Sequence, residues 1–107
     1  SIENITKNAR KQHRDVEVEV ENQRDAMIAA SSGATIVMLD NFSPAQIKKT
    51  ISALQKKKLR NKVKLEASGG INSKNIAAYA KTGVDMISVG SITNSVKSLD
   101  LSLEVCV

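Results

Sequence analysis

Cysteine and aromatic residues are scarce in this 107-residue sequence, which contains one Cys, one Tyr, one Phe and no Trp. The single thiol, Cys106, cannot form an internal disulfide or build a cysteine-based metal site. With 2% aromatic residues, the sequence also lacks the rings on which single-stranded nucleic-acid binders stack bases. These absences leave hydrophobic burial as the main source of stability and predict no nucleic-acid partner.

Long apolar segments and targeting signals are missing as well. No apolar run approaches the roughly 20 residues that cross a bilayer, and the N-terminus does not combine a basic start with an apolar core as a signal peptide does. The composition, 41% hydrophobic and 25% charged with a formal net charge of +5, is that of a globular domain. We therefore predict a cytoplasmic protein with no membrane partner.

Apolar patterns predict four strands that alternate with helices. Val16, Val18 and Val20 alternate with acids, which indicates a strand with one apolar face and one carboxylate face. The continuous apolar run over residues 36–39 is typical of a parallel strand buried on both faces. The predicted strands cover residues 16–21, 36–39, 63–67 and 86–89. Helices are predicted to begin at Ser1, at Asn22, at Ser43 with Pro44 and Gln46 in a capping box, and at Asn72 or Ser73.

An internal repeat extends this βαβαβαβ order to a fold class. Residues 33–40 and 83–90 resemble each other at an offset of 50 residues, which two βα units fill. Eight such units would need about 200 residues, so the sequence predicts part of an open, TIM-like α/β barrel. A doubly wound open sheet is the alternative, but it offers no wet face for Glu17, Glu19 and Glu21. The alternating tail over residues 99–107 adds a predicted C-terminal edge strand.

Ligands of parallel α/β folds bind where the strands end. The first two exits are acidic: Glu19 and Asp40 are placed to accept hydrogen bonds from sugar hydroxyls or to hold Mg²⁺ through its waters. The alternative is a carboxylate face exposed on an edge strand.

The last two strand exits contain glycine and serine, and we expect them to lead into helices, an arrangement that builds phosphate sites from backbone amides. The alternative is that these glycines only make tight turns. Two such exits in succession favour the phosphate site. Its candidate residues are Ser68, Gly69, Gly70, Gly90 and Ser91.

The basic residues are concentrated in one segment. Residues 48–64 contain eight bases and no acid, whereas residues 15–25 contain five acids and one Arg. The basic segment is either a polyanion-binding surface or a solvated helix end with its following loop. We expect it on the amino-terminal side of the sheet, away from the strand exits, which favours the second interpretation.

Six motifs, with the spacing between them, closely resemble the quinolinate phosphoribosyltransferase family. They are Val16-Glu17-Val18-Glu19-Val20-Glu21, Met38-Leu39-Asp40-Asn41, Glu66-Ala67-Ser68-Gly69-Gly70-Ile71, Thr82-Gly83-Val84-Asp85, Ser88-Val89-Gly90-Ser91 and Ser95-Val96-Lys97-Ser98-Leu99-Asp100. The resemblance covers nearly the whole chain from Val16 onward. It implies an α/β barrel domain, of which residues 1–107 form the C-terminal part, without the family's N-terminal sandwich domain and first barrel strands.

The resemblance also implies a reaction and roles for several of the candidate site residues. The family transfers a phosphoribosyl group from phosphoribosyl pyrophosphate to quinolinate with Mg²⁺, releasing pyrophosphate and CO₂ and forming nicotinate mononucleotide for NAD synthesis. The resemblance implies that Glu19 and Asp40 engage the ribose hydroxyls and the metal. It assigns the 5′-phosphate to Ser68, Gly69 and Gly90, and implies a homodimer that shares its active site.

Two departures from the family pattern qualify these roles. Asn94 stands where the family usually has His, and an amide can hydrogen-bond a phosphate but carries no charge. The family's Arg, Lys and His residues for quinolinate and pyrophosphate precede the segment that matches Ser1, so residues 1–107 alone are predicted to be inactive. The alternatives are a related phosphoribosyltransferase with another acceptor, or a noncatalytic dimerising domain.

Overall fold

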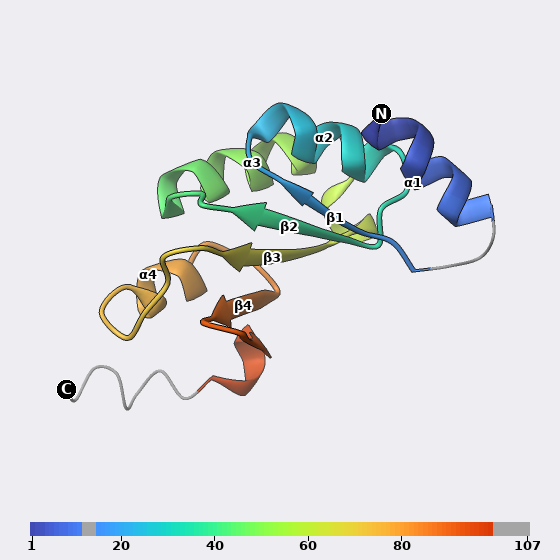
Figure 1. The fold of residues 1–107 in the computed structure, drawn as a ribbon. Coiled ribbons are helices and arrows are strands. Elements are labelled where there is room, and N and C mark those ends of the chain that lie inside the picture. The colour runs from blue at the N-terminus through green and yellow to red at the C-terminus, as the bar shows by residue number, and fades with distance from the viewer. Residues whose placement is uncertain (12–14, 100–107) are drawn as a thin grey trace.

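A computed structural model describes residues 1–11 and 15–99 as one curved sheet with helices against it (Figure 1). The helices are α1 (Ile2–Lys11), α2 (Gln23–Ser31), α3 (Pro44–Lys56) and α4 (Ile76–Ala80). The strands are β1 (Glu17–Val20), β2 (Ile36–Asp40), β3 (Lys64–Ser68), β4 (Met86–Val89) and β5 (Ile92–Ser95). Short 3₁₀ turns, η1 (Arg60–Lys62) and η2 (Val96–Ser98), precede β3 and follow β5. No helix in these ranges is long and apolar enough to cross a membrane.

The strand order confirms the predicted βαβαβαβ fold. The sheet runs β1-β2-β3-β4-β5, and the first four strands pair in parallel. The last strand, β5, pairs antiparallel with β4 and leaves the sheet open. This edge strand covers residues 92–95, which the sequence did not predict as a strand. The C-terminal edge strand was predicted over residues 99–107. Leu99 follows η2 and is not part of a strand, and residues 100–107 lie outside the described residues.

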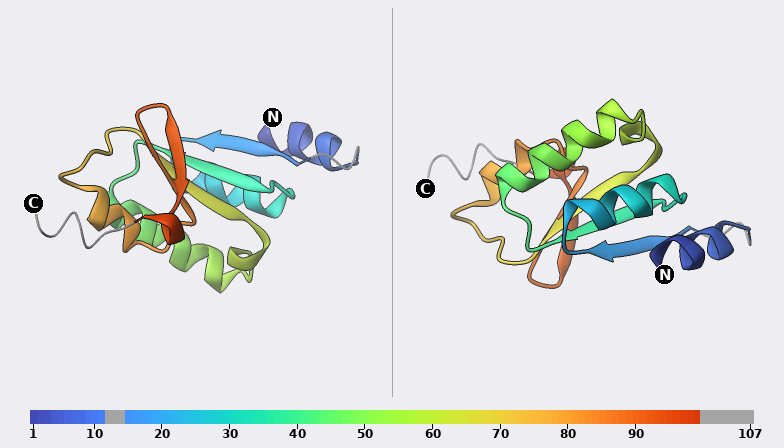
Figure 2. Two further views of the ribbon diagram at one scale, coloured as in Figure 1. Left: turned by 90° about the horizontal axis from the view of Figure 1, so that it is seen from below. Right: turned by 90° about the horizontal axis from the view of Figure 1, so that it is seen from above.

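A single hydrophobic core lies on one face of the sheet. Residues paired in register point to the same face, and every strand residue of the core belongs to that face: Val20, Val37, Leu39, Leu65, Ala67 and Ile87. The helices add Ala26, Ala29 and Ala30 from α2, Ile47, Ile51 and Leu54 from α3, and Ile76 and Tyr79 from α4. Figure 2 shows α2 and α3 running along the strands. One-sided burial matches part of a barrel and excludes the doubly wound alternative for the described residues.

The starts of α2 and α3 were predicted correctly, because in each the predicted residue caps the helix. Asn22 Oδ1 accepts a hydrogen bond from the Asp25 amide at 2.8 Å, and the capping box of Ser43 and Gln46 is complete. The start of α4 at Asn72 or Ser73 was wrong, because α4 begins at Ile76. Asn75 accepts from the Asn72 amide and donates to the Gly70 carbonyl, so these side chains stabilise the turn that precedes the helix.

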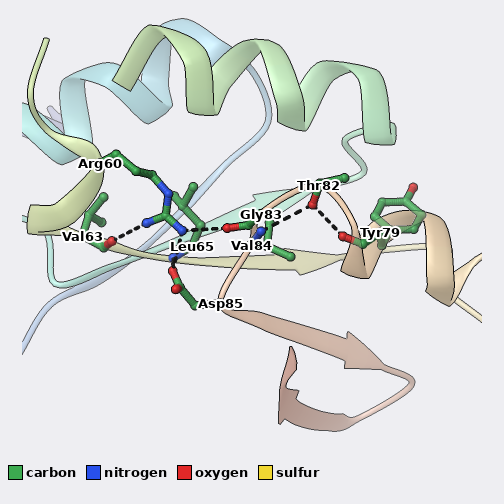
Figure 3. Close-up of polar contacts among 8 residues, drawn as sticks. All are labelled: Arg60, Val63, Leu65, Tyr79, Thr82, Gly83, Val84 and Asp85. Carbon is green, nitrogen blue, oxygen red and sulfur yellow. Dashed lines mark hydrogen bonds and ion pairs between the residues drawn. The ribbon is translucent and has the colours of Figure 1, made fainter. Parts of the chain in front are cut away.

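An arginine holds the amino-terminal edge of β3 and β4 together (Figure 3). The Arg60 guanidinium donates to the carbonyls of Val63 and Gly83 at 2.9 and 2.8 Å and to Asp85 Oδ2 at 2.9 Å. The same Asp85 oxygen accepts from the Leu65 amide at 2.8 Å. Three segments therefore meet at one ion pair. Within the Thr82-Gly83-Val84-Asp85 motif, Gly83 and Asp85 therefore bind Arg60 and stabilise the edge of the sheet opposite the strand exits.

Candidate functional site

The face of the sheet opposite the core carries two rows of polar residues at the carboxyl ends of the strands. Glu19 pairs with Met38, and Met38 pairs with Glu66, which places both acids on this open face. Two residues further along the strands, Asp40 pairs with Ser68, and Ser88 pairs with Thr93. The structure therefore brings Glu19, Asp40 and Ser68 together on one face, as the motifs predicted.

The two predicted acids are free to meet a ligand. Glu19 is exposed and Asp40 is half-buried, and the ion pairs in the described part of the chain involve neither of them. Because Asp40 lies on the neighbouring strand, two residues beyond the partner of Glu19, their Cα atoms are about 8 Å apart by strand geometry. That spacing suits a sugar or a hydrated cation between the two carboxylates.

The exits of β2 and β3 are in direct contact. The Asn41 amide donates to the Ser68 carbonyl at 2.9 Å, and Asn41 adopts a left-handed conformation with φ of 60°. Gly69 is required beside it, because a Cβ on Gly69 would lie 2.5 Å from Asn41 Oδ1 and 3.0 Å from the Asn41 amide nitrogen. This contact fixes the position of Asp40 relative to the loop that follows β3.

Backbone amides at the exit of β3 are available for an anion. Gly69 and Gly70 have positive φ values of 93° and 71°, a conformation that glycine adopts without steric cost. In the described part of the chain, the amides of Gly69 and Gly70 donate to no protein acceptor. Successive unpaired amides of this kind form concave sites for phosphate oxygens.

The predicted helix after the fourth strand was wrong. Gly90 and Ser91 form the two-residue turn of a hairpin between β4 and β5, and the positive φ of Gly90, 63°, suits the first position of such a turn. Five residues also separate Gly70 from the short helix α4. The candidate phosphate site is therefore made of loop amides and hydroxyls and uses no helix N-terminus.

Asn94 is the predicted site residue that the structure places apart from the others. It pairs with Ile87 and therefore lies on the core face of the sheet, whereas Asp40 and Ser68 lie on the open face. The structure does not bring Asn94 together with the two carboxylates, and its predicted contact with phosphate stays a prediction.

Sequence reasoning missed a buried polar group beside the site. Glu66 is 5% exposed on the open face, and its carboxylate accepts a hydrogen bond from Ser88 Oγ at 2.9 Å. Ser88 Oγ is also 2.6 Å from Thr93 Oγ1. An acid between the apolar residues Leu65 and Ala67 was the available signal, but the partners of Glu66 depend on the hairpin, which was not predicted.

The basic segment was placed correctly except at its start. Lys56 ends α3, and Lys62 and Lys64 lie at the amino-terminal edge. Lys49 lies in the first half of α3 and lines a cavity of about 170 Å³ with Glu21, Asn22 and Phe42, which follow β1 and β2. The expectation that residues 48–64 all lie on the amino-terminal side was therefore wrong for Lys49, because α3 starts at the strand exits.

Comparisons with known proteins cover the whole described fold. The family model of the quinolinate phosphoribosyl transferase C-terminal domain matches residues 1–104. A probable nicotinate-nucleotide pyrophosphorylase (carboxylating) from Methanothermobacter thermautotrophicus is 54% identical over 90 residues, which cover 84% of this chain and 32% of the relative. The corresponding protein of Archaeoglobus fulgidus is 43% identical over 105 residues, which cover 98% of this chain and 41% of the relative.

A solved structure shows the same fold. The nicotinate-nucleotide pyrophosphorylase from Francisella tularensis is similar with a TM-score of 0.72 at 41% identity, over 88% of this chain and 34% of that protein. The chain thus spans between about a third and two fifths of the length of the relatives that it matches.

Proposed function

Because the chain belongs to the quinolinate phosphoribosyltransferase family, as its C-terminal domain, we propose that it supplies the ribose-phosphate side of an active site. The proposed enzyme is a pentosyltransferase in NAD biosynthesis that joins quinolinate to phosphoribosyl pyrophosphate. The products are nicotinate mononucleotide, pyrophosphate and CO₂.

One observation carries the proposal. Asp40 and Ser68 are paired on the open face, and the Asn41–Gly69 contact joins the acidic exit to the exit with two unpaired glycine amides. A ribose 5-phosphate has vicinal hydroxyls, which donate to carboxylates, and a phosphate, which accepts from amides. Adjacent acidic and amide-rich exits are complementary to both ends of that molecule.

The same residues support the chemistry of transfer. Departure of pyrophosphate from C1 leaves an oxocarbenium-like sugar, which the carboxylates of Glu19 and Asp40 stabilise electrostatically. The pyridine nitrogen of quinolinate then attacks C1, and loss of CO₂ completes the reaction. The amides of Gly69, Gly70 and Gly90, with the hydroxyls of Ser68 and Ser91, would anchor the 5′-phosphate throughout.

Glu19 and Asp40 also fit a magnesium ion that retains water. Mg²⁺ is commonly held by one or two carboxylates together with substrate phosphates, and groups of three or more metal-ligating side chains are absent among the described residues. Bound Mg²⁺ would neutralise charge on the departing pyrophosphate. Glu19 and Asp40 would hold its waters and orient the ribose hydroxyls.

Recognition of quinolinate and pyrophosphate requires cations. On the open face of the described strands, Lys64 is the basic residue, and it lies at the amino-terminal end of β3. We therefore propose that Arg, Lys and His residues outside this chain, partly from the second subunit of a homodimer, complete the acceptor site. Sedimentation of the protein expressed from its natural reading frame tests the dimer, and a monomer at micromolar concentration would contradict it.

A product assay on the same protein tests the function. With Mg²⁺ and phosphoribosyl pyrophosphate, we expect quinolinate to give nicotinate mononucleotide, pyrophosphate and CO₂ in equal amounts. Nicotinate in place of quinolinate serves as the matched control, because it yields the same nucleotide without CO₂. Preference for nicotinate would assign another acceptor, and the absence of product from either acid would contradict the proposed enzyme.

A further inference from the structure

Glu66 is a buried carboxylate to which the proposed reaction assigns no role. Its side chain is 5% exposed and belongs to neither ion pair of the described residues. A buried carboxylate is costly unless polar groups compensate for lost water. Here the compensating groups are the hydroxyls of Ser88 and Thr93, which we call the Glu66–Ser88–Thr93 network.

The direction of the hydrogen bonds in this network follows from counting hydrogens. A carboxylate only accepts, so the Ser88 hydroxyl donates its one hydrogen to Glu66 Oε2 across 2.9 Å. Ser88 Oγ therefore acts as the acceptor in the 2.6 Å contact with Thr93 Oγ1. Thr93 donates to Ser88, Ser88 donates to Glu66, and hydrogen bonds to a charged acceptor are stronger than neutral ones.

The network connects three strands around the phosphate turn. Ser88 and Thr93 are a cross-strand pair of β4 and β5, and the residues between them include the Gly90–Ser91 turn. Glu66 lies in β3, two residues before Ser68. The two segments proposed to offer amides to the phosphate are thus tied together on the open face, two residues before Ser68 in β3 and two residues before Gly90 in β4.

We propose that Glu66 is a positioning residue that, through Ser88 and Thr93, holds the Gly90–Ser91 turn in register with the Ser68–Gly70 loop for binding the 5′-phosphate of the sugar substrate. This inference rests on the proposed function, because it concerns the phosphate of the same substrate. It concerns affinity for the ribose-phosphate half and leaves the affinity for quinolinate unchanged.

The most informative variants are at Thr93, because this residue is exposed and substitutions at exposed positions usually leave the fold intact. Thr93→Val removes the hydroxyl at nearly constant shape, and Thr93→Ser keeps it. Glu66→Gln removes the charge that orients the network. Asp85→Asn is the control, because it weakens a carboxylate contact at the opposite edge of the sheet.

Binding of ribose 5-phosphate to the protein expressed from its natural reading frame is measured by calorimetry, with steady-state kinetics alongside. We expect Thr93→Val and Glu66→Gln to weaken ribose 5-phosphate binding and to raise the KM for phosphoribosyl pyrophosphate by about fivefold to tenfold. The KM for quinolinate should stay unchanged, and Thr93→Ser should behave as the parent. Asp85→Asn should lower the melting temperature without changing either KM.

Equal effects of Thr93→Val and Thr93→Ser would overturn the inference, as would a rise in both KM values. If the parent protein binds ribose 5-phosphate but forms no nucleotide, the proposed reaction fails while the binding measurements still decide the role of Glu66. If the parent protein does not bind ribose 5-phosphate, both proposals are wrong.

Discussion

Asp40 has the most specific proposed role of any single residue, because it pairs with Ser68 and is followed by the residue that contacts Gly69. We expect Asp40→Asn to reduce the rate of nucleotide formation about a hundredfold, since it removes one preorganised charge from the transition state. The control is Glu17→Gln, which neutralises an exposed acid on the same face but at the amino-terminal end of β1. Equal rates for the two variants would remove Asp40 from the mechanism.

Two neighbouring glycines differ in their surroundings and allow a second comparison. Both have positive φ, but a Cβ at position 69 would contact Asn41 closely, whereas nothing lies within 4 Å of one at position 70. We expect Gly70→Ala to cost about 1–2 kcal/mol from backbone strain, and Gly69→Ala about 3 kcal/mol or more because overpacking adds to the strain. Urea unfolding measures both costs, and equal losses would show that the Asn41–Gly69 contact does not constrain the loop.

At the residue scale, the sequence predicted those site residues whose position depends on one strand alone. Asp40 follows a continuous apolar run and Ser68 follows the predicted strand over residues 63–67, so their place at the carboxyl edge could be inferred. The pairing of Ser88 with Thr93 depends on a hairpin, and hydrogen bonding to Glu66 depends on that pairing. Contacts that follow from tertiary pairing are not visible in local patterns.

At the element scale, the start of α3 is specified by its capping box. Ser43→Ala should lower the free energy of unfolding by about 1 kcal/mol, because it removes the acceptor for the Gln46 amide. Ser73→Ala is the matched control, since Ser73 was a predicted cap but lies outside α4, and it should change stability by less than about 0.5 kcal/mol. Thermal unfolding measures the stability of both variants. A larger loss of stability for Ser73→Ala than for Ser43→Ala would contradict the described start of α4.

The stability of the amino-terminal edges of β3 and β4 depends on the hydrogen bonds of Arg60. Its side chain is 16% exposed and Asp85 is 40% exposed, so water partly screens this pair. Arg60→Met should still cost about 1–2 kcal/mol, because two carbonyls and Asp85 lose a charged donor.

The exposed Lys7–Glu3 pair on α1 provides the comparison for Arg60. Lys7→Met should cost less than about 0.5 kcal/mol. Both variants should keep the KM values of the parent, since neither residue is near the strand exits. If Arg60→Met changed the KM for phosphoribosyl pyrophosphate, the separation of the stabilising edge from the binding edge would be wrong.

Elements with strong periodicity or clear caps were predicted well, and short ones were not. The predicted strand segments 36–39, 63–67 and 86–89 correspond to β2, β3 and β4. The capping box correctly predicted the start of α3. In contrast, β5 has four residues, of which only Ile92 is large and apolar, and α4 has five. Segments this short take their structure from packing and pairing with neighbours.

At the scale of the whole molecule, the fold separates the hydrophobic core from the face of the sheet that is proposed to bind the substrate. Helices bury one face of the sheet, and the other face carries Glu19, Asp40 and Glu66. The one-sided carboxylate pattern of β1 favoured a barrel over a doubly wound sheet at the sequence level, and the single core confirms that choice.

The carboxyl edge of β1 to β4 is the proposed binding site for ribose phosphate. A crystal structure of the protein expressed from its natural reading frame, with ribose 5-phosphate and Mg²⁺, tests it most directly. We predict the phosphate within hydrogen-bonding distance of the Gly69 and Gly90 amides, and the ribose hydroxyls beside Glu19 and Asp40. A phosphate bound instead among Lys58, Arg60 and Lys62 at the amino-terminal edge would show that the strand exits are not the ribose-phosphate site.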